Sequence, residues 1–122
     1  MGSNEFIDLG ANSTDSVDYP EFGNNLALAI KEGRADRGIL ICGSGIGISI
    51  AANRHAHIRA ALCTDVTMAK LTRLHNDANV LALGARIIGN QVALDITDTF
   101  LKTEYEGGRH DRRVSQLSEI CS

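Results

Sequence analysis

Cys42 is the residue of this chain that is best placed for chemistry. It ends the apolar run Gly38-Ile39-Leu40-Ile41-Cys42 and precedes the glycine-rich segment Gly43-Ser44-Gly45-Ile46-Gly47. The apolar run predicts a buried strand, and the Ala-rich segment that follows, up to Asn53, predicts a helix. In parallel α/β sheets ligands bind at the carboxyl ends of strands, where glycines expose backbone N–H groups beside a helix N-terminus. Cys42 therefore stands where a reactive group is expected.

Two readings of Cys42 follow from the residues alone. A thiol beside a helix N-terminus favours the thiolate and can act as a base, whereas most cysteines are small core residues. A Gly-x-Gly-x-Gly segment is weak evidence for a ligand by itself, and here its third glycine comes too early for the dinucleotide fingerprint. Its place between a strand and a helix favours chemistry. Cys63 and Cys121 lack such a loop, and we expect the first in the core and the second without a role.

His75 and Asn76 form a second candidate group at the end of an expected helix. The pKa of histidine lies close to neutral pH, which suits it to proton transfer. A single histidine at a helix end is more often a surface residue that contacts the last carbonyls. Asn76 is either a hydrogen-bonding residue of a site or a helix terminator.

Three arginines are candidates for binding an anion. Arg109 and Arg113 follow a glycine pair with i,i+4 spacing, so their guanidinium groups can converge on one phosphate. Arg86, after the apolar run that ends at Gly84, is a third candidate cation. A charged pair on a helix is more often a solvated surface. His110 is expected either to assist the arginines or to be an exposed helix residue.

Composition excludes several classes of protein. The chain has 122 residues and a net charge of -3, and it shows no basic stripe that would suggest a nucleic-acid partner. No apolar run approaches the ~20 residues of a membrane span. The three cysteines form no C-x-x-C pair, so neither a disulfide framework nor a zinc site is indicated. We expect one domain over residues 1–122 in a cytoplasmic protein, without a metal.

Apolar runs and amphipathic segments alternate along the chain. Expected strands are Glu5–Gly10, Gly38–Cys42, Ile58–Cys63 and Asn79–Gly84. Five helices are expected. The first runs from Pro20 to Gly33, the second follows the glycine-rich segment and ends at Asn53, and the third runs from a cap at Thr64 or Asp65 to about His75. The fourth runs from a cap at Asn90 through Val92, Ile96 and Phe100, and the fifth from about Arg109 through Val114 and Leu117. Strand and helix in alternation predict an α/β fold with a parallel sheet and helices on both faces.

Five segments, in this order, resemble the type B ribose-5-phosphate isomerases, a family that also includes the galactose-6-phosphate isomerase subunits. They are Asp18-Tyr19-Pro20, Ile39 to Asn53, Ile58-Arg59-Ala60-Ala61, His75 to Leu81, and Gly107-Gly108-Arg109-His110 with Arg113. The resemblance implies a Rossmann-like three-layer sandwich, a homodimer with active sites at the subunit interface, and no metal or organic cofactor. It implies interconversion of ribose 5-phosphate and ribulose 5-phosphate, a reaction of the pentose phosphate pathway.

The resemblance also implies roles for single residues. Cys42 resembles the base that moves a proton through a cis-enediol, and Ser44 belongs to the same catalytic loop. His75 resembles the residue that opens the sugar ring. The remaining implied contacts are with substrate, from Gly43, Gly45, Ile46, Gly47, Asn76, Arg86, Arg109 and Arg113, where the last two reach the partner subunit's site.

The chain departs from the family's pattern in two ways. Ser44 stands where the family usually has threonine, which keeps the hydroxyl. The family's first strand and helix, with an Asp-His pair that helps to bind the sugar and the phosphate, have no counterpart. Two alternative functions therefore stand beside the isomerase: a non-catalytic subunit that binds a sugar phosphate, and an inactive truncated fragment of the same family.

Overall fold

The computed structural model of this chain describes residues 19–120. Two sequence expectations, the strand Glu5–Gly10 and the role of Cys121, lie outside these residues. The side chains described are those of residues 21–119.

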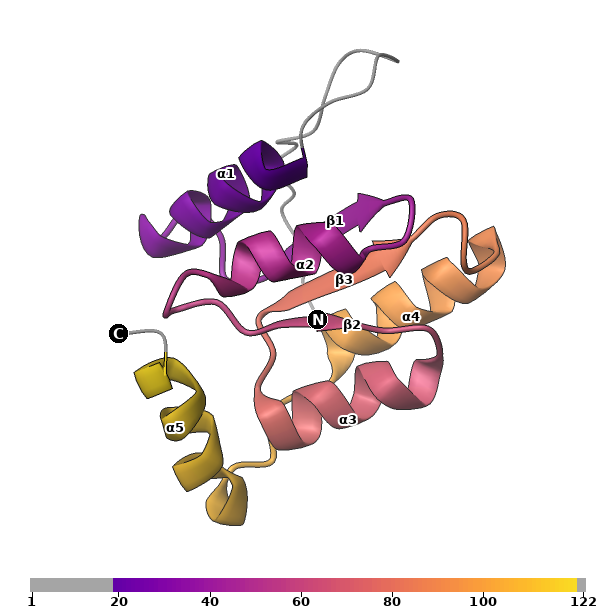
Figure 1. Cartoon of the computed structure of the whole chain (residues 1–122). Coiled ribbons are helices and arrows are strands. Elements are labelled where there is room, and N and C mark those ends of the chain that lie inside the picture. Colours follow the sequence, from indigo (N-terminus) through magenta and orange to yellow (C-terminus); the bar gives the residue numbers. More distant parts are fainter. Residues whose placement is uncertain (1–18, 121–122) are drawn as a thin grey trace.

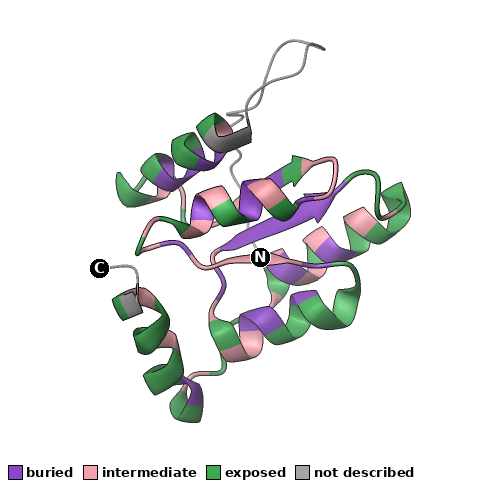
Figure 2. Cartoon of the chain, in the orientation of Figure 1, coloured by how far each residue is buried: buried purple, intermediate pink, exposed green. Residues whose placement is uncertain are grey.

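A parallel sheet of three strands forms the centre of the described fold (Figure 1). β1 (Gly38–Cys42) and β2 (Ala60–Leu62) both pair with β3 (Val80–Gly84), which gives the order β1-β3-β2. Because β3 is paired on both edges and covered on both faces, all five of its residues are buried, which Figure 2 shows as a continuous purple strand. Such a strand reads as an uninterrupted apolar run.

Helices cover both faces of the sheet, as the alternation of strands and helices predicts. One face carries α1 (Tyr19–Lys31) and α2 (Ile46–Asn53), and the other carries α3 (Val66–Asn76) and α4 (Asn90–Lys102) (Figure 1). A 3-10 turn, η1 (Gly108–His110), leads into α5 (Asp111–Ile120). Figure 1 shows α5 beside the end of the sheet where the strands begin, projecting away from the two layers of helices.

Successive residues of β3 point into two separate cores. Val80 and Ala82 pack with residues of α1 and α2, whereas Leu81 and Leu83 pack with residues of α3 and α4. This period of two is the geometry of a strand. Phe100 of α4 is fully buried in the second core.

The structure confirms most expected elements and corrects some details. Of the two caps that the sequence allows, Asp65 and not Thr64 caps α3, because its Oδ1 accepts the N–H of Met68 at 2.7 Å. Asn90 is the first residue of α4 and not its cap, since Gly89 occupies that position without a side-chain hydrogen bond. Val92 does not continue the buried stripe of α4 formed by Ile96 and Phe100, and it is 41% exposed. β2 is shorter than the expected strand.

Two glycines fix the path of the chain at the carboxyl end of the sheet. Gly45 has φ 79°, a left-handed conformation that costs an L-residue about 1–2 kcal/mol. A Cβ on Gly84 would collide with the carbonyl oxygen of Ser44. Both positions therefore require the absence of a side chain.

We predict that Gly45→Ala and Gly84→Ala each lower the free energy of unfolding by about 1–3 kcal/mol in urea denaturation. Gly43→Ala is the matched control, because its Cβ would meet its nearest atoms at an ordinary 3.5 Å and its φ is not positive. We expect the control to change stability by less than about 0.5 kcal/mol. A Gly84→Ala variant as stable as the unmodified chain would contradict the close approach of Ser44.

Candidate active site

Cys42 lies at the carboxyl end of β1, where it pairs with Gly84 of β3. The glycine-rich loop turns back over its sulfur, because Gly45 adopts the left-handed conformation and its N–H donates to Sγ of Cys42 at 3.2 Å. Gly45 is also the residue that precedes the first turn of α2. The structure therefore places the thiol, half-buried, beside a helix N-terminus.

Two backbone N–H groups of the glycine-rich loop donate to side-chain atoms of Cys42 and Ser44. The hydroxyl of Ser44 accepts the N–H of Ile46 at 3.2 Å, and the Gly45 N–H is engaged by the sulfur. Two of the N–H groups expected to face a developing oxyanion thus have partners within the loop. Ser44 holds the first turn of α2 in place through this contact.

Arg86 joins the Cys42 loop from the segment after β3. The N–H of Ala85 donates to the carbonyl of Cys42 at 2.8 Å, and the N–H of Arg86 donates to the carbonyl of Gly43 at 2.9 Å. The side chain of Arg86 passes over Gly43, since a Cβ there would lie 3.5 Å from its Cδ and Nε. An exposed guanidinium group is thereby held next to the loop. We call Cys42, the loop 43–47 and Arg86 the cysteine group.

His75 lies in the last turn of α3, and its ring stacks on the ring of His110. The ring centroids are 4.4 Å apart and the planes differ by 21°. His110 is only 7% exposed, so it isn't the exposed helix residue that one sequence reading allowed. The chain turn at Gly107 and Gly108, both with positive φ, brings His110 back against α3.

The other residues near His75 are exposed and polar. Asn76 is exposed at the end of α3. Arg109 donates from Nε to Nε2 of His110 at 3.4 Å, and Arg113 is exposed one turn further along, in α5. We call His75, Asn76, Arg109, His110 and Arg113 the histidine group.

The cysteine group and the histidine group lie at opposite ends of the sheet. In the pairing of β1 with β3, Cys42 lies opposite Gly84 and Gly38 lies opposite Val80. His75 precedes Val80 in the chain, so it lies beyond the amino ends of the strands, and the four residue steps from Gly38 to Cys42 span about 13 Å. Figure 1 shows this separation between the end of β1 and the end of α3. Within one chain, the length of the sheet therefore separates Cys42 from His75.

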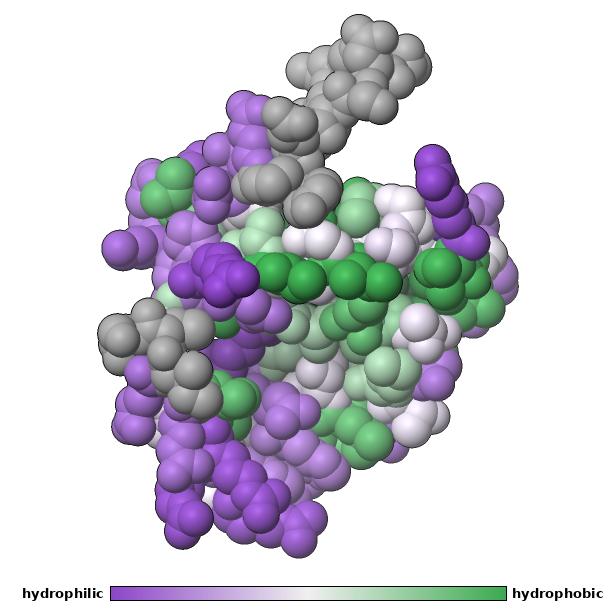
Figure 3. Space-filling view, in the orientation of Figure 1, coloured by the Kyte–Doolittle hydropathy of each residue, from purple (hydrophilic) through white to green (hydrophobic). Residues whose placement is uncertain are grey.

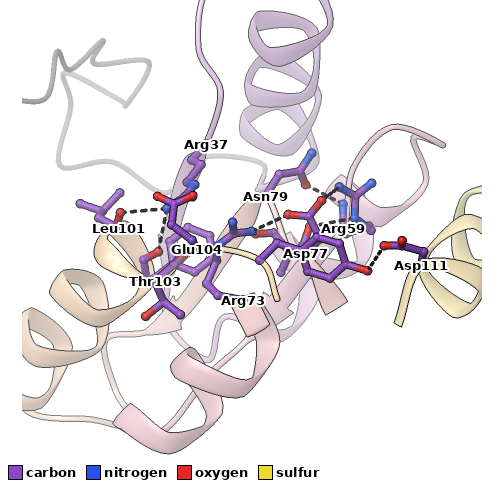
Figure 4. A network of polar contacts seen from close by, with 12 residues as sticks. Arg37, Arg59, Arg73, Asp77, Asn79, Leu101, Thr103, Glu104 and Asp111 are labelled. Atoms are coloured by element: carbon purple, nitrogen blue, oxygen red, sulfur yellow. Dashed lines mark hydrogen bonds and ion pairs between the residues drawn. The ribbon is translucent and has the colours of Figure 1, made fainter. Parts of the chain in front are cut away.

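A buried arginine holds the end of α3 that carries His75 (Figure 4). The guanidinium of Arg73 donates to Asp77 at 2.9 Å, to the carbonyl of Ala78 at 2.7 Å and to the carbonyl of Thr103 at 2.9 Å. It also lies over the ring of Phe100. Because the side chain of Arg73 is only 5% exposed, these contacts replace water for a full positive charge.

Two further arginines extend this network. Arg59 pairs with the carboxylate of Asp77 at 3.4 Å, and Arg37 donates to the carbonyl of Leu101 at 2.8 Å. Burial, with the nearby charge of Arg73 as the next cause, lowers the pKa of Arg37. In the described part of the chain, every buried side-chain nitrogen or oxygen has a hydrogen-bond partner. The network thus fixes the backbone on both sides of His75 and Asn76.

Within residues 19–120, one set of side chains approaches the spacing of a metal site. Ligand atoms of His75, Glu106 and His110 all lie within 4.8 Å of one another. Imidazole nitrogens donate in the plane of the ring, and the two rings are stacked with nearly parallel planes. Their lone pairs therefore run side by side and do not converge on one ion.

Sequence reasoning missed the parts of this site that come from tertiary contacts. His110 and Glu106 were not distinguishable from surface residues of a charged segment, because their partner His75 is far away in the chain. The glycine pair before Arg109 was the only local signal of a sharp turn. The spacing of residues in the sequence does not indicate that Arg73 is buried in its ion pair with Asp77.

Comparisons with known proteins agree with this fold. Residues 2–117 match the family model described as Ribose/Galactose Isomerase. The ribose-5-phosphate isomerase B of Escherichia coli is 50% identical over 116 residues, which cover 95% of this chain and 78% of that protein. The structure of the ribose-5-phosphate isomerase B of Clostridium thermocellum has a TM-score of 0.91 and 58% identity, over 93% of this chain and 77% of that one.

A further solved structure carries a ligand. The ribose-5-phosphate isomerase B of Mycoplasma genitalium, with bound ribulose-5-phosphate, has a TM-score of 0.88 and 41% identity, over 93% of this chain and 76% of that one. In the described residues of this chain, no helix is long and apolar enough to cross a bilayer.

The two described cysteines are expected to differ sharply in reactivity. Burial, with the charge of Asp65 as a smaller cause, raises the pKa of Cys63 to about 11, and its side chain is 1% exposed. At about pH 8 it remains a buried, protonated thiol, which reacts slowly with alkylating reagents. We predict that iodoacetamide modifies Cys42 before Cys63, as measured by peptide mass mapping over time. Equal rates at both positions would contradict the burial of Cys63.

Proposed function

Because the chain belongs to the ribose/galactose isomerase family, we propose that it interconverts ribose 5-phosphate and ribulose 5-phosphate. One observation carries this proposal: the chain matches a ribose-5-phosphate isomerase B at 50% identity over 95% of its length. This function would place the protein in pentose phosphate metabolism. The free thiols of Cys42 and Cys63 fit the reducing, cytoplasmic setting expected from the sequence.

In this proposal Cys42 transfers the proton between the two reacting carbons. As thiolate it takes the proton from C2 of the open-chain aldose, and the electron pair moves to the C1 oxygen to form a cis-enediolate. Transfer of the proton of the C2 hydroxyl to the C1 oxygen and return of the first proton from the thiol to C1 give the ketose and regenerate the thiolate. The Ser44 hydroxyl and the N–H groups of the loop 43–47 other than those of Gly45 and Ile46 stabilise the charge on oxygen, because donors held by a rigid backbone need no reorganisation.

His75 acts before this step, on the closed form of the sugar. It donates a proton to the ring oxygen while the hydroxyl on C1 loses its proton, which opens the furanose. Asn76 contacts sugar hydroxyl groups. Arg109 and Arg113 bind the phosphate, with Arg86 as a further cation. Since the chain has a net charge of -3, a dianion requires such a local cluster.

We further propose that each complete site forms between two copies of the chain. The cysteine group of one copy would face the histidine group of the other, since about 13 Å of sheet separates the two groups within one copy. A two-fold axis would then create two identical sites. The projection of α5 away from its own sheet supports this arrangement (Figure 1).

Apolar surface beside the cysteine group also supports a second copy. Figure 3 shows apolar residues that run across α2 toward the segment after β3. Ile41, Ile46, Ile50 and Ile87 are each more than half exposed there. Burial of large apolar side chains favours association, because it removes apolar surface from water. A contact between two copies over this surface would bring the partner's histidine group to the edge of the Cys42 loop.

Mixing of inactive variants tests the shared site. We predict that Cys42→Ala and His75→Asn each lose about 10²–10⁴-fold in turnover. After subunit exchange, an equal mixture of these two variants should regain about a quarter of the unmodified activity, because half of the dimers then contain one intact site. Isomerase activity is measured from ribose 5-phosphate.

A second mixture is the control. His75→Asn and Arg113→Ala lie in the same group, so every site of their mixed dimer lacks one of the two residues. We expect no recovery from this pair. If both mixtures regain isomerase activity, the assignment of residues to two groups is wrong. It is also wrong if neither mixture regains activity although the subunits demonstrably exchange. A chain that is inactive before any substitution would favour a binding subunit or an inactive fragment.

The ring-opening role of His75 is tested with a substrate that cannot close its ring. In 4-deoxyribose 5-phosphate the hydroxyl that closes the furanose is absent, so the aldehyde is always open. We predict that His75→Asn lowers kcat/KM for ribose 5-phosphate by about 10²-fold or more and changes the value for the deoxy analogue by about twofold or less. Equal losses on both substrates would assign His75 to binding or to structure.

A further inference from the structure

We propose that His110 is a positioning residue for His75, held in place by Glu106 and by the turn at Gly107 and Gly108. This inference rests on the proposed ring-opening role of His75. It adds to that role a residue that touches no substrate in the proposed mechanism.

The stacked contact fixes the orientation of the His75 ring. With centroids 4.4 Å apart and planes 21° from parallel, the face of His75 lies on the face of His110. Rotation of His75 about its Cβ–Cγ bond would drive its edge into this neighbour. His110 is 7% exposed, so it provides a fixed surface, whereas His75 is only partly buried. The edges of the His75 ring, which carry the nitrogens, stay outside the stack.

The chain before His110 is tied to the same turn of α3 that carries His75. The N–H of Glu106 donates to the carbonyl of Leu74 at 3.1 Å. The hydroxyl of Tyr105 donates to Asp111 at 2.8 Å, which closes the segment into a compact turn. Burial and this hydrogen bond raise the pKa of Tyr105 to about 12, so the phenol remains a donor at neutral pH. His110 is therefore located relative to His75 by backbone contacts and by the loop itself.

The edge of the His110 ring faces one anion and one cation. Its Nε2 lies 3.4 Å from Oε1 of Glu106 and 3.4 Å from Nε of Arg109. A single nitrogen can't donate to the carboxylate and accept from the guanidinium at once, so the tautomer decides which contact forms. When Arg109 turns to a phosphate, Nε2 donates to Glu106 and the ring stays anchored. Glu106 thus keeps the His110 ring stacked on His75 while Arg109 binds the phosphate.

Two variants and a matched control test this inference. His110→Ala removes the stacked ring, and Glu106→Gln removes the charge of its anchor at a half-exposed position. Glu104→Gln is the control, because this carboxylate lies in the same segment, is exposed and contacts Arg37 instead. Each variant is assayed with ribose 5-phosphate and with open-chain 4-deoxyribose 5-phosphate. Ring protons of His75 are followed by NMR, and thermal melting reports folding.

For His110→Ala we expect kcat/KM for ribose 5-phosphate to fall about tenfold or more, since small misplacements of a reacting group have large effects on rate. The value for the deoxy analogue should change by about twofold or less, because both substrates carry the same phosphate. Glu106→Gln should lower kcat/KM for ribose 5-phosphate by a smaller factor, again without a matching loss for the deoxy analogue. Glu104→Gln should change neither value. In a His75→Asn background, His110→Ala should cause no further loss.

Three results would overturn the inference. They are equal losses on both substrates, a full additional loss in the His75→Asn background, and unchanged His75 ring-proton shifts in His110→Ala. If His110→Ala does not fold, Glu106→Gln tests the inference instead, through the ratio of its losses in kcat/KM for ribose 5-phosphate and for the deoxy analogue. Failure of the proposed function is distinguishable, because the unmodified chain would then turn over neither substrate while the NMR shifts still report the stack.

Discussion

The parallel pairing of β3 with both of its neighbours is the constraint on which the other features depend. β3 is buried over its whole length, and its residues alternate between the two cores. Because all three strands run in the same direction, every chain segment that follows a strand starts at one end of the sheet, and every helix returns to the other. The register of β1 on β3 therefore decides where each polar group can lie.

This constraint divides the chemistry of the chain into two parts. The segments after β1 and β3 meet at the carboxyl end, where backbone hydrogen bonds join Cys42 and Gly43 to Ala85 and Arg86. The end of α3 lies at the opposite end, together with the turn that leads into α5. The shared site that we propose between two copies rests on this division, since the proposed base and the proposed ring-opening residue lie at different ends of one chain's sheet.

The arginines of the chain also divide into two kinds. Arg37, Arg59 and Arg73 are at least partly buried and donate to carbonyls and to Asp77 near the ends of α3 and α4, so their charges hold the backbone. Arg86, Arg109 and Arg113 are exposed. Removing one partner of a buried charge costs about 3–5 kcal/mol, whereas exposed ion pairs contribute less than about 1 kcal/mol. Burial thus distinguishes the arginines that hold the backbone from the exposed ones to which we assign the proposed binding of phosphate, although their spacing in the sequence does not.

The sequence by itself determined the features that depend on neighbours in the chain. The apolar runs of β1 and β3, the glycine loop after Cys42 and the Asp65 cap are local patterns, and the structure has them where the residues predict. Only the tertiary structure decided that Cys42 and His75 lie at opposite ends of the sheet, and that His110 is buried against His75. The physical reason is that strand register and helix packing join residues far apart in sequence. A charged segment such as Glu104 to Arg113 carries no local signal of which side chain will be turned inward.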